Sequence, residues 1–191
     1  QEAMGYLMSF ENNADPSDVF SGATFGGVAM TRVDATSDIG ESGFTEAYFL
    51  GASVADGNQT VVCTVSSGAN AKWGVSFTVE ADGDVQTAGS CIVGIDAEDP
   101  SCTITGISGA SWAAAGMHSG QNAEASTTAG SGFTLGPSID NGSQTTASER
   151  STSQLASGDQ AVQFLTVASD DVAMVAVAIE QKSRALMVES E

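Results

Sequence analysis

The chain has 191 residues, which is enough for one domain with a buried core. Only 15% of the residues are charged and 6% are aromatic, whereas 41% are hydrophobic, so hydroxyl groups and small residues must cover much of the surface. The 24 acidic residues outnumber the 5 Lys and Arg and give a formal charge of −19, which argues against nucleic acid as a partner. No apolar run approaches the roughly 18 residues of a membrane-spanning helix, so we expect no contact with a membrane.

The first part of the chain predicts a strand followed by a hairpin. The sequence starts at Gln1 without an initiator methionine, so either a leader has been removed or the sequence begins inside a longer product. Residues 3–11 form the first predicted strand. Residues 19–25 and 28–33 are β-forming runs on either side of Gly26-Gly27, an arrangement typical of a hairpin with a two-residue turn.

The middle of the chain predicts a meander of short strands, separated by Asp, Gly and Pro residues that favour turns. The strand at residues 72–79 alternates with period two and should place the apolar side chains from Trp73 to Val79 on one buried face. The predicted strands of this part are residues 44–50, 59–65, 72–79, 91–95, 102–107 and 110–117.

The last part of the chain combines a polar excursion with a strongly apolar end. Residues 120–143 are rich in Ser, Thr, Gly and Ala and predict a long loop with at most one strand, near 132–135. Residues 160–168 and 172–179 predict a buried antiparallel hairpin. The second of these runs is long enough for a helix, but its β-branched residues favour a strand.

About ten to thirteen short strands without helices predict an all-β fold, specifically a two-sheet antiparallel β-sandwich of jelly-roll type. We expect a single domain over residues 1–180 and a polar tail over residues 181–191.

The three cysteines, Cys63, Cys91 and Cys102, leave their redox state open because their number is odd. We favour three buried free thiols. The alternative is a small disulfide ring closed by Cys91 and Cys102, which flank an acidic loop.

The sequence carries no convergent catalytic motif, so we expect no enzyme. His118 is the only imidazole, and neither an orienting partner nor a GxSxG motif accompanies it or its neighbour Ser119. We therefore expect a strand-end or interface role for His118. Paired carboxylates are defined in space, so the 24 acidic residues give no signal for glycoside hydrolysis.

We expect no cofactor, with calcium as the one possible exception. Calcium prefers several carboxylate and carbonyl oxygens on flexible loops, but Asp is also common in ordinary turns. No candidate matches the spacing of an EF-hand. The candidates are Asp82, Asp84, Asp96, Glu98 and Asp99, with Asp170 and Asp171 further along the chain.

The hairpin segment resembles a pattern of tailed-bacteriophage virion proteins, in which an aromatic residue and Gly-Gly precede a strand with Ala-Met-Thr. The residues that carry the resemblance are Phe25, Gly26, Gly27, Met30 and Thr31. The resemblance is looser over most of the remaining chain. It implies a jelly-roll-like sandwich on a phage particle, as a capsid decoration, head-fibre or tail-associated subunit, and it brings no catalytic residues.

The sequence therefore predicts a structural subunit of a virion surface or an extracellular assembly, whose partners are other virion structural proteins and copies of itself. One alternative is a lectin-like module that binds carbohydrate or a cell surface, with Tyr6, Tyr48 and the tryptophans as possible glycan platforms. A further alternative is a subunit of a secreted filament. The long loop at residues 120–143 and the two chain ends are the expected contact segments, the ends through Gln1, Glu2, Met4, Tyr6, Leu186, Met187 and Val188.

Overall fold

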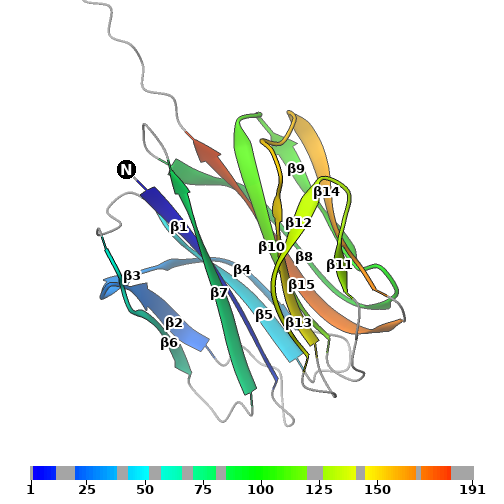
Figure 1. Ribbon diagram of the computed structural model, residues 1–191, viewed down its shortest axis with the longest axis horizontal. Coiled ribbons are helices and arrows are strands. Elements are labelled where there is room, and N and C mark those ends of the chain that lie inside the picture. The colour runs from blue at the N-terminus through cyan, green and yellow to red at the C-terminus, as the bar shows by residue number, and fades with distance from the viewer. Residues whose placement is uncertain are drawn as a thin grey trace, which may run out of the picture.

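The described part of the chain folds entirely into antiparallel β-structure. The computed structural model describes residues 2–11, 20–37, 43–51, 57–65, 71–80, 85–119, 127–140, 145–166 and 169–181. Their strands form four sheets, which lie side by side from left to right in Figure 1 and are numbered here in that order. None of the described residues forms a helix long and apolar enough to cross a membrane.

The chain divides the four sheets between its two halves. The first sheet has the order β3-β2-β6, with β2 (Phe20–Phe25), β3 (Val28–Ala29) and β6 (Val61–Val65). The second sheet has the order β4-β5-β1-β7, with β1 (Glu2–Glu11), β4 (Thr31–Ser37), β5 (Gly43–Leu50) and β7 (Ala71–Glu80). The third sheet has the order β12-β13-β10-β15-β8, with β8 (Val85–Ala97), β10 (Ser111–Ser119), β12 (Phe133–Asp140), β13 (Thr145–Ser151) and β15 (Asp170–Gln181). The fourth sheet has the order β11-β14-β9, with β9 (Ser101–Ile107), β11 (Thr128–Ala129) and β14 (Gly158–Leu165).

Three hydrophobic clusters join neighbouring sheets. Strand β5 contributes to two of them because its side chains alternate: Phe44 and Tyr48 face the first sheet, whereas Ala47 and Phe49 face the third. The third cluster joins the third and fourth sheets and contains Phe164 with the apolar residues of several strands. The four sheets therefore share a continuous stack of cores.

Strand β15 is the most deeply buried element. Every residue from Val172 to Ile179 is buried, as expected for a continuous apolar run in a strand covered on both faces. Val172 and Met174 pack toward the fourth sheet, and Val175 and Val177 pack toward the second. The strand predicted for this run is confirmed.

The predicted hairpin of the last two strands is wrong. Strand β14 pairs with β9 and β11, whereas β15 pairs with β8 and β10, so the two strands lie in different sheets. The physical reason is that Val162 and Phe164 of β14 pack face to face with Val172 and Met174 of β15 across one core. Packing across the core buries both apolar faces, which side-by-side pairing would not do.

Other elements differ from the prediction in number and length. The all-β antiparallel class is confirmed, but the described residues form four sheets where two were predicted. Strand β13 was not predicted because it is polar, and it nevertheless buries five of its seven residues: Thr145, Ala147, Ser148, Glu149 and Ser151. Strand β8 begins six residues earlier than predicted, at Val85.

The predicted Gly-Gly hairpin is confirmed. Gly26 and Gly27 have φ angles of 56° and 80°, as a type I′ turn requires, and Phe25 pairs with Val28 across it. Phe25 and Met30 are buried in the cluster between the first and second sheets. Thr31 begins β4, so the chain passes from the first sheet to the second at Met30.

Candidate functional site

The longest strand at a sheet edge is β8, with 13 residues at one end of the third sheet. One side of β8 pairs with β15, and no strand of the described ranges pairs with the other side. Unpaired N–H and C=O groups along such an edge can accept another strand. Only Asp96 carries a charge in this strand, and the strand has no proline.

The opposite edge of the same sheet, β12, is protected. It contains Pro137, which has no N–H to donate, and its pairing with β13 is irregular between Leu135 and Ser138. Strand β8 also has an irregularity, at Ala88, but it contains no proline and its residues 89–97 pair regularly with β15, so this part of β8 is better suited than β12 to accept a further strand.

Side-chain exposure alternates along β8. Ile92, Gly94 and Asp96 are exposed, and the exposed fraction of Ile92 is 43%. Cys91 and Val93, which point the other way, are half-buried against the fourth sheet. A strand added to β8 would therefore meet an apolar and an acidic side chain on the exposed face.

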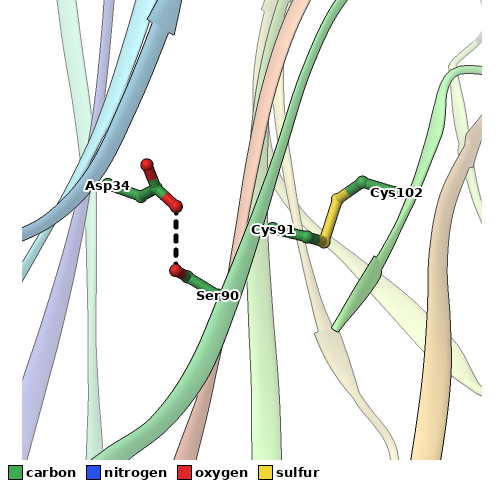
Figure 2. The surroundings of a disulfide bond; sticks show 4 residues. All are labelled: Asp34, Ser90, Cys91 and Cys102. Carbon is green, nitrogen blue, oxygen red and sulfur yellow. Dashed lines mark hydrogen bonds between the residues drawn. A yellow bond between two sulfur atoms is a disulfide. The ribbon is translucent and has the colours of Figure 1, made fainter. Parts of the chain in front are cut away.

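Both faces of β8 are fastened to neighbouring sheets at adjacent residues. The Ser90 hydroxyl donates a hydrogen bond to Oδ2 of Asp34 in β4 over 2.8 Å, which ties β8 to the second sheet. Cys91 forms a disulfide with Cys102 in β9, which ties it to the fourth sheet. Figure 2 shows the two links on opposite sides of the strand. The edge is thus held in an extended conformation before any partner binds.

The favoured prediction of three free thiols is wrong, and the alternative disulfide is present because β8 and β9 bring the two cysteines together. Cys91 and Cys102 are oxidised and lie 11 residues apart in the chain. Cys63 is reduced and half-buried in β6, beside the cluster between the first and second sheets.

The end of β8 near Ala97 carries a concentration of acidic groups. Asp96 lies opposite Asp171 of β15, and the Ser169 hydroxyl donates to Asp96 over 2.8 Å. Burial, followed by the charges of Asp96 and Asp170, raises the pKa of Asp171. The negative potential at this end favours a cationic partner group.

The calcium candidates do not gather into a metal site within the described ranges. These ranges contain no group of three or more His, Cys, Asp or Glu side chains placed to hold a metal ion. The Asp99 carboxylate accepts a hydrogen bond from the Thr166 backbone N–H over 2.8 Å and so stabilises the turn after β8. Glu98 is exposed in that turn. Asp82 and Asp84 lie outside the described residues.

His118 and Ser119 end strand β10 in a buried polar cluster. The Ser119 hydroxyl donates directly to the Asp170 carboxylate, and Nδ1 of His118 lies 3.3 Å from the Thr146 hydroxyl. In a nucleophilic triad the imidazole would lie between hydroxyl and carboxylate, which differs from these contacts. Burial lowers the pKa of His118 to about 4, partly opposed by the charge of Asp170, so the imidazole is neutral near pH 7.

Two glutamates are buried inside the stack. Glu46 of β5 is fully buried; its Oε1 lies 3.3 Å from Arg32, and Tyr48 hydrogen-bonds to it. Burial raises the pKa of Glu46, opposed by Tyr48 and Arg32. Glu149 of β13 accepts a hydrogen bond from the Gly130 N–H over 3.1 Å, and burial raises its pKa to about 7.

The predicted contact residues have different positions. Glu2, Met4 and Tyr6 lie in β1, whose backbone pairs with β5 on one side and β7 on the other, so only their side chains could reach a partner. The remaining predicted contacts, at Gln1 and at Leu186, Met187 and Val188, lie outside the described residues. Of the long loop predicted at residues 120–143, the described part contains β11 and β12.

The aromatic platforms expected for a glycan site are only partly described. Tyr48 is 4% exposed and hydrogen-bonds to Glu46, so it offers no surface to a sugar. Trp112 is half-buried. The side chains of Tyr6 and Trp73 lie outside the description, and Val75, beside Trp73 in the predicted core face, packs half-buried between the second and third sheets.

The open edge itself was missed in the sequence, and the absence of charge gave no signal for it. Residues 85–95 contain no charged residue, but residues 100–123 form a longer stretch without Asp, Glu, Lys or Arg. Which side of a strand remains unpaired depends on the order of strands in the sheet, and local patterns do not determine that order.

Comparison with known proteins gives no relative of this chain. A scan against protein-family models, a search of curated proteins and a search of solved structures each found no match.

The disulfide predicts a stability difference. A Cys91→Ser/Cys102→Ser double variant should lose about 3 kcal/mol of unfolding free energy, because the disulfide closes a short loop in the unfolded chain. Urea denaturation measures the loss. A reductant should destabilise the wild type and leave the double variant unchanged. Equal stability of the two oxidised proteins would contradict a structural role.

The buried Glu149 predicts a pH dependence. Its folded-state pKa of about 7 exceeds the ordinary 4.5, so the folded protein holds a proton that the unfolded chain releases, and its contribution to stability is lost as pH rises through 7. The free energy of unfolding of Glu149→Gln, relative to that of the wild type, should therefore rise by about 2–3 kcal/mol between pH 4.5 and pH 8. Urea denaturation at both pH values measures it. The exposed Glu98→Gln variant is the control, and parallel pH profiles for Glu149→Gln and wild type would refute the expectation.

Proposed function

We propose that this protein is a structural subunit of a virion surface or an extracellular assembly and that it acts through contacts with copies of itself and with other structural proteins. The observation that carries the proposal is the open edge of β8. This edge is long, free of proline and nearly free of charge, and it is fastened on both faces. Native proteins usually protect such an edge unless a partner covers it.

Pre-organisation of the edge favours binding. A partner strand loses less free energy to ordering when the receiving strand is already extended and rigid. The Asp34–Ser90 hydrogen bond and the disulfide hold β8 in that form at its middle.

The disulfide supports an extracellular or virion-surface location. Disulfides persist in oxidising surroundings and are rare in the cytosol. The net charge of −19 suits a surface exposed to solvent and gives no support to nucleic acid as a partner.

The strand order supports a jelly-roll-like arrangement of the second half of the chain. The third sheet contains the order β8-β15-β10-β13, and the fourth has β9-β14-β11. Numbered from β8 as strand one, these orders are 1-8-3-6 and 2-7-4, the interleaving produced by folding an eight-stranded antiparallel ribbon into two Greek keys. Strand five, β12, departs from this pattern because it pairs with β13 in the third sheet and not with β11 in the fourth. Jelly rolls occur in viral capsid and lectin domains. The buried Tyr48 weakens the lectin-like use, so we favour the structural one.

The proposal predicts that self-association depends on the β8 edge. Ile92→Lys should weaken association in sedimentation velocity because a desolvated ammonium opposes pairing at this edge. The matched control is Ile139→Lys on β12, because both isoleucines are 43% exposed and lie on opposite edges of one sheet. The control should associate as the wild type does.

Labelling of the native source tests the location. Antibodies against the protein should decorate virions or extracellular filaments at regular positions in electron micrographs. A protein that stays monomeric at every concentration and labels no particle or filament would overturn the proposed function.

A further inference from the structure

We propose that the open edge of β8 accepts the C-terminal segment of a second copy, residues 182–191, as an added antiparallel strand. The inference rests on the proposed assembly function and names its partner. The segment reads Lys-Ser-Arg-Ala-Leu-Met-Val-Glu-Ser-Glu. It supplies two of the five cations of the chain and then a short apolar run, and β8 offers an acidic end and then an apolar middle.

The two sequences are complementary when they run in opposite directions. With Arg184 opposite Asp96, Val188 falls opposite the exposed Ile92. The same alignment places Lys182 opposite Glu98 in the adjoining turn. Glu189 and Glu191 then fall opposite Cys91 and Gly89, where β8 has no charge. Opposite charges and apolar pairs directly across an antiparallel ladder each stabilise the pairing.

A parallel alignment would lose this match. Gln181, the last residue of β15, pairs with Val85 at the start of β8. A segment that turned back along β8 of its own chain would run parallel to it. Its cations would then lie against the uncharged start of the strand, and its glutamates would approach Asp96. The charge match is therefore specific to an antiparallel strand and is lost when the segment turns back, parallel to β8, within its own chain.

The antiparallel strand cannot come from the same molecule. To pair antiparallel, the segment would first have to travel the length of β8 from Val85 to Ala97, about 40 Å at the rise of a strand. The ten residues from 182 to 191 span at most about 36 Å when fully extended. A second copy is thus the only source within reach, and repeated donation builds a head-to-tail chain of subunits.

Cysteine cross-linking tests the register. Residues directly opposite in an antiparallel pair have Cα atoms about 4.5–5.5 Å apart, which a disulfide can bridge. The full-length Ile92→Cys/Val188→Cys variant should form a ladder of linked multimers on non-reducing gels. Mass spectrometry of the digested protein should identify the link between positions 92 and 188, separately from the native Cys91–Cys102 bond and from Cys63.

The control uses the opposite edge of the same sheet. Ile139→Cys/Val188→Cys places the first cysteine at an equally exposed isoleucine on β12 and should form no ladder. A 92–188 link inside a monomer would overturn the proposal in favour of an intramolecular strand. A ladder of equal yield in the control would show that the segment does not select β8.

Charge exchange supplies a second measurement. Arg184→Glu and Asp96→Arg should each weaken association about tenfold, and the double variant should recover most of the loss because the pair is restored with reversed signs. If the wild type associates but the double-cysteine variant forms no 92–188 link and the double charge variant recovers no association, the inference alone is refuted. Wild-type protein that does not associate would refute the proposed function as well.

Discussion

The architecture depends on the burial of β15 on both faces. Strand β15 lies inside the third sheet, and its alternating side chains fill the core toward the second sheet and the core toward the fourth. A strand in this position favours apolar side chains, and residues 172–179 are all Val, Ala, Met or Ile. Three alanines in that run keep the side chains short, which lets two sheets approach one strand closely. The N-terminal half of the chain is thereby attached to the C-terminal half.

Buried polar groups accompany this packing and respond to pH in opposite ways. A folded-state pKa raised to about 7 makes Glu149 unfavourable above neutral pH. His118, whose pKa is lowered to about 4, is unfavourable below its ordinary value of 6.5, because the unfolded chain then binds a proton that the folded protein excludes. Glu149 accepts a hydrogen bond from the Gly130 N–H, and Nδ1 of His118 lies beside the Thr146 hydroxyl. Each of these two buried side chains thus lies beside a hydrogen-bonding group of another segment of the chain.

Much of the local structure could be predicted from the sequence, whereas the arrangement of sheets could not. The Gly26-Gly27 turn and the β-branched run of β15 have strong local signals, and both were identified. Strand β13 gave none, because Thr, Ser and Glu become strand residues only between β10 and β12, which supply the backbone pairing. The separation of β14 from β15, and hence the open side of β8, arises from packing across a core between residues distant in the chain. Likewise the disulfide depends on the placement of β8 opposite β9, which the spacing of the cysteines in the sequence does not determine.

The charge distribution explains how one edge can remain open without causing indiscriminate aggregation. A net charge of −19 repels other copies at long range, and this repulsion is screened beyond about 10 Å at moderate salt. The acidic end of β8 is therefore approached most readily by a positively charged part of another copy. Lys182 and Arg184 make the C-terminal segment such a place, because three cations remain for all other residues of the chain. The net negative charge opposes most contacts between copies, whereas the contact of the C-terminal segment with β8 is attractive. This difference selects one mode of contact, and the selectivity increases as ionic strength falls.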